Sequence, residues 1–280
     1  MERKDVRRLI EEHGLKPIKG RGQNFLCEPG IAEAMADAAG IAADDKIVEV
    51  GPGLGILTEA LLGRGARVLA IELDPKLALI ARERIASDRL EILQGDALSF
   101  AVADLAARLG AGAGEYKVVA NLPYSITSDA LRKFVSGRPR PASLTVMVQR
   151  EVADRITAAP PEMSLLSVAV RIYGEARKIM DVPASMFHPE PKVDSAVLHV
   201  RLHSEAELDV LLAGIDPEKV LGLAKIGFAG RRKQLKNTLA AKYPKETLER
   251  AFAAAGIAPT ERPERLTVSD WVRLAGALMR

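Results

Sequence analysis

The sequence predicts an α/β protein that carries a small helical domain at its C-terminal end. Short apolar runs typical of buried strands alternate with helical periodicities between residues 47 and 202. A glycine-rich turn joins the first of these runs to a helix, and only helical patterns follow Glu205. A chain of 280 residues is long enough for one large and one small domain. We therefore expect domains at residues 1–204 and 205–280.

The elements of the first domain follow from apolar patterning and from the Gly and Pro residues that interrupt it. Helices are predicted at residues 4–14, 29–39, 56–62, 101–109, 127–135 and 150–158. Strands are predicted at residues 47–50, 67–72, 90–94, 116–120, 144–149, 165–173, 176–182 and 196–202. Residues 16–26 are expected to form a basic loop.

The composition is that of an ordinary globular protein, with 48% hydrophobic and 28% charged residues. The formal net charge is +3, and the basic excess lies at the two ends of the chain. Residues 1–27 hold seven Lys and Arg against four Asp and Glu, and residues 204–280 hold thirteen against ten. This distribution favours a polyanionic partner.

Cys27 is the only cysteine, so no disulfide can form within the chain. The charged N-terminus lacks the apolar segment of a signal peptide, and no apolar run approaches the ~20 residues of a membrane span. We therefore expect a cytoplasmic protein with no membrane partner. His13, His199 and His203 lack metal-ligand spacing, and no metal site is expected.

The clearest motif is a strand, glycine-rich turn, helix and strand unit of the kind that binds nucleotides. The strand Ile47–Val50 leads into Gly51-Pro52-Gly53-Leu54-Gly55, and the second strand ends at Glu72. Glycines allow the backbone to approach a ligand closely, and a carboxylate at the second strand end can accept hydrogen bonds from ribose hydroxyls.

The ligand of this unit is better described as an adenosyl group than as a dinucleotide. The dinucleotide fingerprint requires a small residue at its sixth position, where this chain has Ile56, which disfavours a dehydrogenase. Asp96 follows the third strand and can accept a hydrogen bond from an adenine amino group. Two acids at successive strand ends, without a pyrophosphate seat, fit S-adenosylmethionine.

A second motif, Asn121-Leu122-Pro123-Tyr124, follows the predicted strand at residues 116–120. The Asn carboxamide and the Leu122 carbonyl can accept both protons of an exocyclic amine, and Tyr124 offers a face on which a base can stack. The alternative is a strand-to-helix turn with an Asn cap and a core Tyr. The tetrapeptide alone does not decide between the two.

Taken together, the motifs resemble those of the ribosomal RNA adenine N6-dimethyltransferases, above all the small-subunit branch of that family. The resemblance runs from about Lys19 to the C-terminal helices. It rests on residues 22–26, 49–55, Glu72, 95–97, 121–124, 187–197 and 228–239.

The resemblance implies a Rossmann-like, seven-stranded methyltransferase sheet whose last strand is antiparallel, followed by a small all-helical RNA-binding domain. It implies a cofactor site for S-adenosylmethionine made by Gln23, Asn24, Leu26, Gly51, Gly53, Gly55, Glu72, Asp96, Ala97 and Asn121. It further implies that the target adenine is held by Asn121, Leu122, Tyr124 and Phe187. The basic run Arg231-Arg232-Lys233 would contact RNA phosphates.

The implied activity is dimethylation of adenosine N6 in small-subunit rRNA, within an immature 30S-type particle, by a monomeric enzyme. Two alternatives remain open at this point. One is the related large-subunit rRNA methyltransferase that confers macrolide resistance, and residues 228–239 favour the small-subunit branch over it. The other is a ribosome-assembly factor that keeps the fold without catalysis, and the intact acidic and Asn-Leu-Pro-Tyr motifs argue against it.

Overall fold

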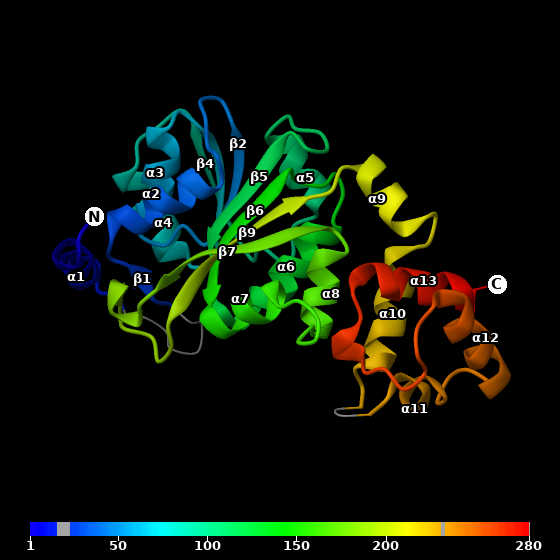
Figure 1. The fold of residues 1–280 in the computed structure, drawn as a ribbon. Coiled ribbons are helices and arrows are strands. Elements are labelled where there is room, and N and C mark those ends of the chain that lie inside the picture. The colour runs from blue at the N-terminus through cyan, green and yellow to red at the C-terminus, as the bar shows by residue number, and fades with distance from the viewer. Residues whose placement is uncertain (16–22, 231–232, 280) are drawn as a thin grey trace. The chain divides into compact units, whose positions relative to one another are not determined.

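The computed structural model describes residues 1–15, 23–230 and 233–279, and its central feature is a mixed seven-stranded sheet (Figure 1). The strands of this sheet are ordered β4-β3-β2-β5-β6-β9-β7. Their bounds are β2 Lys46–Val50, β3 Arg67–Glu72, β4 Leu90–Gln94, β5 Tyr116–Asn121, β6 Ser143–Gln149, β7 Gly174–Val182 and β9 Ser195–Leu202. The expected seven-stranded α/β fold is confirmed.

The order of the strands reverses between β2 and β5, which places a crevice at the carboxyl ends of these two strands. The chain runs from β2 outward to β3 and β4, and then returns to the opposite side of β2 as β5. The pairs β2–β3, β3–β4, β2–β5 and β5–β6 are parallel. Ligands of open α/β sheets bind where the strand order reverses in this way. β9 is antiparallel to β6, as expected for the last strand.

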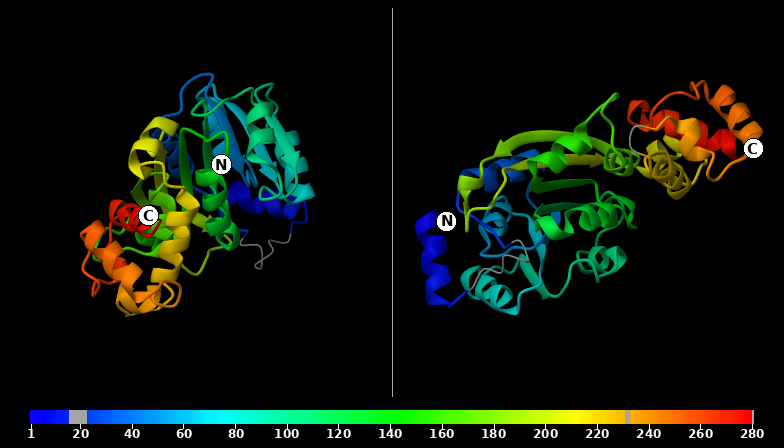
Figure 2. Two further views of the ribbon diagram at one scale, coloured as in Figure 1. Left: turned by 90° about the vertical axis from the view of Figure 1, so that its right-hand side faces the viewer. Right: turned by 90° about the horizontal axis from the view of Figure 1, so that it is seen from below.

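Helices cover both faces of the sheet (Figures 1 and 2). Those of the sheet-containing part are α1 Arg3–Glu12, α2 Pro29–Ala38, α3 Ile56–Gly63, α4 Pro75–Arg84, α5 Val102–Arg108, α6 Thr127–Ser136 and the start of α7 Arg150–Thr157. On one face, apolar residues of α2, α3 and α4 pack against Ile47, Val119 and Met147 in a single core cluster. Strands alternate their side chains between the two faces of the sheet, which explains why the inner strands β2, β5 and β6 are mostly apolar, whereas the edge strands β4 and β7 carry more polar residues.

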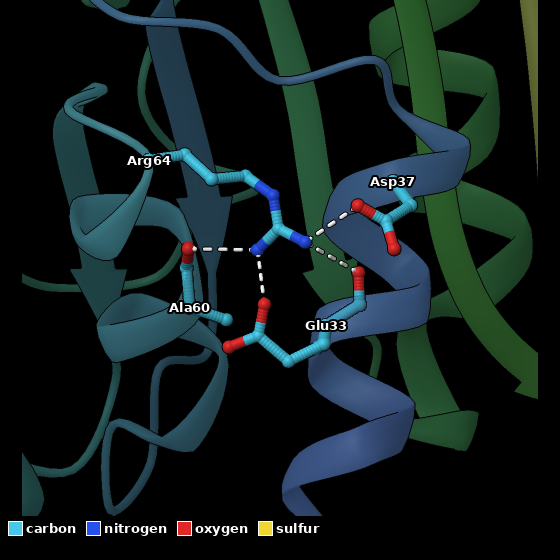
Figure 3. Close-up of polar contacts among 4 residues, drawn as sticks. All are labelled: Glu33, Asp37, Ala60 and Arg64. Atoms are coloured by element: carbon cyan, nitrogen blue, oxygen red, sulfur yellow. Dashed lines mark hydrogen bonds and ion pairs between the residues drawn. The ribbon is translucent and has the colours of Figure 1, made fainter.

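The helix α3, which follows the glycine-rich turn, is also held to α2 by polar contacts of Arg64 (Figure 3). The Arg64 guanidinium donates to Asp37 Oδ1 at 2.6 Å, to the Glu33 carbonyl at 3.1 Å and to the Ala60 carbonyl at 3.2 Å. It also pairs with the Glu33 carboxylate. Since both carboxylates are largely exposed, the net stabilisation is small, about 0–1 kcal/mol per pair.

A second, two-stranded sheet joins parts of the chain that lie far apart in sequence. β1 (Phe25–Leu26) pairs antiparallel with β8 (Phe187–His188), so that Leu26 lies opposite Phe187. The Cys27 amide donates to the Met186 carbonyl at 2.8 Å and extends this contact. The predicted loop at residues 16–26 is therefore wrong at its end, because Phe25 and Leu26 form a short strand against the segment between β7 and β9.

The chain forms two compact units, residues 1–153 with 176–202, and residues 154–175 with 203–280. The second unit contains the second half of α7 together with α8 Leu165–Arg171, α9 Glu205–Leu212, α10 Pro217–Gly227, α11 Leu235–Leu239, α12 Lys245–Ala255 and α13 Val268–Leu278. Its core surrounds the fully buried Trp271, whose ring centroid lies 5.8 Å from that of Phe228. The predicted domain boundary, between residues 204 and 205, lies two residues after the division between Leu202 and His203.

The sequence did not indicate that residues 154–175 belong with the helical unit. The Met163 amide donates to the Glu264 carbonyl at 3.0 Å, and α8 packs against α10. The predicted strand at residues 165–173 is wrong, because Leu165–Arg171 forms the helix α8. Ser164 and Ser167 form a capping box there, and these side-chain bonds start a helix in an apolar run too short for its period to be read.

Candidate active site

A cavity opens at the carboxyl ends of β2 and β5, and it contains most of the predicted site residues. Its volume is about 90 Å³. Side chains from β1, the glycine-rich turn, β3, β5 and β8 contribute to its wall. The predicted residues in this wall are Gln23, Asn24, Leu26, Gly51, Gly53, Glu72, Asn121, Leu122, Tyr124 and Phe187.

The three glycines of the turn all have positive φ angles, between 56° and 84°, which side-chain-bearing residues rarely adopt. A Cβ on Gly53 would lie 3.3 Å from the Phe25 ring, and one on Gly55 would lie 2.3 Å from Ile85 Cδ1. The backbone of the turn is thus open to the cavity on one side and tightly packed on the other.

Glu72, at the end of β3, is fixed by backbone amides. Its carboxylate accepts hydrogen bonds from the Gly53 amide at 3.1 Å and the Asp74 amide at 2.9 Å. Burial raises the pKa of Glu72, and these amide bonds oppose the rise. The carboxylate therefore couples the glycine-rich turn to the end of the neighbouring strand, at the position expected for a ribose partner.

A second cavity, of about 180 Å³, lies beside the first and shares Gly51, Glu72 and Pro123 with it. Asp96 and Ala97, which follow β4, line this second cavity. Asp96 Oδ1 accepts a hydrogen bond from the Leu98 amide at 2.8 Å, which fixes the carboxylate at the strand end. Glu72 thus stands between a cavity that contains Asn121 and one that contains Asp96.

Glu49, on β2, is a buried carboxyl group that also lines the first cavity. Thr58 Oγ1 donates to Glu49 Oε2 at 2.7 Å, whereas Oε1 makes no hydrogen bond to the described part of the chain. Burial raises the pKa of this group to about 8, partly offset by the Thr58 bond and increased by the nearby Glu72. The sequence placed Glu49 in the glycine motif but gave it no role of its own.

Asn121 is the last residue of β5, where it lies opposite Met147 of β6. The Leu122 amide donates to the Met147 carbonyl at 3.1 Å, so the backbone stays fixed to the sheet beyond the strand end. Pro123 then turns the chain into a short 3₁₀ helix, Tyr124–Ile126. The Tyr124 hydroxyl lies 2.7 Å from Ser195 Oγ, a partner that the sequence did not predict.

The structure brings the residues predicted to bind the cofactor and those predicted to hold the target adenine to one edge of the sheet, with one exception. Gly55 is the N-cap residue of α3, and it is absent from the linings of both cavities as formed by the described residues. Phe187 is fully buried in the wall of the first cavity. Lys233 is exposed in the helical unit, while Arg231 and Arg232 and the loop at residues 16–22 lie outside the described residues.

These features fit an adenosyl cofactor. Carboxylates stand at two successive strand ends, Gly51 borders both cavities, and Glu49, which lines the first cavity, has one carboxyl oxygen without a hydrogen bond to the described residues. In the described ranges no three His, Cys, Asp or Glu side chains group as a metal ion would require. Every described helix is also too short or too polar to cross a membrane. The fold and the site define a methyltransferase that uses S-adenosylmethionine.

The particular family follows from comparison with known proteins. The family model for ribosomal RNA adenine dimethylase matches residues 18–279, so the chain belongs to that family. A protein of Anaeromyxobacter dehalogenans is 40% identical over 97% of both chains. One of Dehalococcoides mccartyi is 38% identical over 96% of this chain and 91% of its own. Both relatives are named ribosomal RNA small subunit methyltransferase A.

Two solved structures extend the comparison. A dimethyladenosine transferase from Plasmodium falciparum is 25% identical with a TM-score of 0.75, covering 89% of this chain and 95% of its own. The 23S rRNA methyltransferase ErmE is 28% identical with a TM-score of 0.72, covering 92% of this chain and 100% of its own. The expected family, fold class and enzymatic nature of the chain are confirmed.

Proposed function

We propose that this enzyme transfers methyl groups to N6 of adenosines in 16S rRNA, twice on each of two adjacent adenosines in a hairpin loop near the 3′ end. The observation that carries the proposal is the shared cavity of Asn121, Leu122 and Tyr124 with the glycine-rich turn. An amine-holding group and a cofactor-holding group open on the same space, which is the arrangement that direct methyl transfer requires.

The cofactor would span the two cavities. Glu72 would accept hydrogen bonds from the ribose hydroxyls, and Asp96 would accept one from the adenine amino group. Asn24, Leu26 and Gly51 would surround the methionine end, next to Asn121. When bound, S-adenosylmethionine supplies an electrophilic methyl group on a positively charged sulfur.

Asn121 and Leu122 would prepare the target amine. The lone pair of an adenine amino nitrogen is delocalised into the ring, which makes the nitrogen a poor nucleophile. If Asn121 Oδ1 and the Leu122 carbonyl each accept one N–H, the nitrogen is held with its lone pair out of the ring plane. Positioning of this kind supplies much of the rate, and the proton lost from N6 passes to solvent without a dedicated base.

Tyr124 and Phe187 would hold the base once it has left its stack. A base inside folded RNA must be extruded before it can enter such a cavity. Stacking on an aromatic ring is worth roughly 1–3 kcal/mol per base, which offsets part of the cost of extrusion. Tyr124 is partly exposed at the cavity, whereas Phe187 lies buried in its wall.

The choice of the small subunit is supported by the names of relatives that are 36–40% identical over nearly the whole chain. Likeness to ErmE, whose title gives 23S rRNA, is lower at 28% identity. The substrate would be rRNA in an immature 30S-type particle, bound by a monomeric, cytoplasmic enzyme. The helical unit would contact RNA phosphates through Arg231, Arg232 and Lys233.

The test is to incubate the enzyme with labelled cofactor and either immature small subunits or large-subunit particles, and then to map the labelled nucleotides. We expect two adjacent dimethylated adenosines near the 3′ end of 16S rRNA and none in 23S rRNA. Labelling of 23S rRNA instead would favour the large-subunit activity. Binding without labelling would favour an assembly factor.

The basic run has its own test. Replacing Arg231, Arg232 and Lys233 by Ala should weaken particle binding and flatten its salt dependence, because each phosphate contact contributes roughly −0.7 to −0.9 to the log–log slope. Cofactor affinity should not change. Replacing Lys242, Lys245 and Arg250 of the same unit by Ala provides a control of equal charge. An unaltered slope in the first variant would assign the run to a solvated surface.

A further inference from the structure

The segment between β7 and β9 carries Phe187, and Asp194 closes it at its base. Asp194 Oδ1 accepts a hydrogen bond from the Ala184 amide at 3.0 Å, which joins the two ends of the segment. Its Oδ2 accepts from Arg150 Nη1 at 3.0 Å, and its carbonyl accepts from the Arg150 amide, also at 3.0 Å. The segment is thus anchored to the end of β6, where α7 begins.

The next residue, Ser195, makes a contact in a different direction. It is the first residue of β9, lies opposite Gln149 of β6 and is fully buried. Its Oγ lies 2.7 Å from the Tyr124 hydroxyl. Pro123 fixes the backbone on one side of Tyr124, and Ser195 fixes the far end of its ring.

The two aromatic rings of the proposed base site are therefore attached to consecutive residues. Asp194 holds the segment that carries Phe187, and Ser195 holds Tyr124. On its other side Phe187 is fixed by its pairing with Leu26. A pair of stacking surfaces binds a base only if their separation and tilt are set beforehand, since ordering them on binding would cost affinity.

We propose that Ser195 and Asp194 are positioning residues that fix the orientation of Tyr124 relative to Phe187 for the target base. The proposal rests on the proposed function, in which these rings hold the adenine. It assigns the two residues no contact with the cofactor or with the reacting nitrogen. Their effect would reach the reaction through the geometry of the rings alone.

A cycle of variants tests the Ser195 contact: Ser195→Ala, Tyr124→Phe and the double variant. Each single change removes the same hydrogen bond, so each should slow single-turnover transfer at saturating cofactor by roughly 2- to 10-fold. The double variant should be no slower than the slower single variant. Ser195→Thr, which keeps a hydroxyl, should recover most of the rate. Cofactor affinity, measured by calorimetry, should stay unchanged in all four.

Tyr116→Phe serves as a matched control. The Tyr116 hydroxyl also makes a 2.7 Å hydrogen bond, which it donates to the Pro139 carbonyl. Tyr116 begins β5, whereas Tyr124 follows the other end of that strand. Its loss should lower the melting temperature without slowing transfer. If Tyr116→Phe slows transfer as much as Ser195→Ala, or if the losses in the double variant simply add, the positioning role is wrong.

A readout without substrate separates this proposal from the proposed function. The pKa of the Tyr124 phenol is raised by burial, lowered by the Ser195 bond and raised by the Asp194 charge. It should therefore rise further in Ser195→Ala and fall in Asp194→Asn, as NMR of ring-labelled tyrosine can measure. If the Tyr124 pKa rises in Ser195→Ala and falls in Asp194→Asn, but the wild type does not methylate rRNA, the proposed function is wrong while the Tyr124–Ser195 contact stands. Wild-type rates in Ser195→Ala would overturn the positioning role only.

Discussion

The proposed cofactor side and the proposed base side of the active site, called below the cofactor side and the base side, are built in different ways. The cofactor side is drawn mainly from residues 49–97, with Asn24, Leu26 and Asn121 added to it. Its carboxylates Glu72 and Asp96 accept hydrogen bonds from backbone amides at most 19 residues away in sequence. The base side joins residues 121–124 to residues 187–195 and to β1, through side-chain contacts and a two-stranded sheet. Local backbone bonds can form the first side, whereas the second requires the whole sheet.

Asn121 is the residue where the two sides meet, and its loss should have the largest effect. In Asn121→Ala we expect methyl transfer to slow by about 10²–10³-fold, because one preorganised acceptor for the amine is lost. Single-turnover transfer at saturating cofactor measures this, with thermal melting as the control for folding. A near-normal rate would mean that the amine is held elsewhere and that the two sides do not meet at this residue.

Glu72 tests whether the cofactor side depends on its carboxylates. In Glu72→Ala we expect the affinity for S-adenosylmethionine to fall by about 10- to 100-fold, because hydrogen bonds to a charged acceptor are lost. Calorimetry measures this. The exposed Glu91 of β4 provides a control, and Glu91→Ala should bind the cofactor normally. Equal affinity in both variants would remove Glu72 from the site.

Glu49 should make the cofactor side sensitive to pH. Its pKa is about 8 in the folded protein, against roughly 4.3 in an unfolded chain. Between these pH values Glu49 keeps a proton in the folded state that it has released in the unfolded state. The contribution of Glu49 to the unfolding free energy is therefore complete below about pH 4 and is lost as the pH rises toward 8.

The comparison with Glu49→Gln isolates this group, since the variant keeps Glu72, whose pKa is also raised by burial, but has no titratable side chain at position 49. From pH 5.5 to 8, cofactor-free wild type should lose about 1–3 kcal/mol more unfolding free energy than Glu49→Gln. Denaturant unfolding at several pH values measures the difference. Parallel curves would show that the buried carboxyl group does not titrate in this range.

The smallest expected effect concerns the glycine-rich turn. Gly55→Ala places a Cβ at φ +84° and 2.3 Å from Ile85 Cδ1, which should cost about 1–2 kcal/mol of unfolding free energy. Gly63, at the end of the same helix, has a negative φ and open space around it, so Gly63→Ala should be neutral or slightly stabilising. Equal effects of the two changes would mean that the turn tolerates a side chain.

The same contrast explains what the sequence could predict. Glu72, Asp96 and Asn121 were expected at strand ends, and each lies there, because an apolar run followed by a polar residue is a local signal. The order of strands and the shared edge then follow from the rules for parallel sheets. The positions of the residues proposed for the cofactor side, at the ends of neighbouring strands, could therefore be predicted from the sequence.

The base side could be predicted only in part. Tyr124 was proposed from the Asn-Leu-Pro-Tyr motif and Phe187 from the family resemblance, but Ser195 was not predicted, because 71 residues separate it from Tyr124. Nothing in the sequence near Phe25 and Leu26 reveals that they pair with residues 187 and 188. The unbonded oxygen of Glu49 also became visible only once the residues around it were placed.

The pairing of β1 with β8 has a consequence for how the enzyme is made. Chains are synthesised from the N-terminus at about 5–20 residues per second, and folded parts form as their residues emerge. Phe25 and Leu26 emerge early but must wait for residues 187 and 188 to find their partners. A nascent chain can thus assemble the glycine-rich turn and its strands well before it can enclose a base. Because residues 187 and 188 lie about two-thirds of the way along the chain, a chain terminated before them would lack the Phe187 wall of the site.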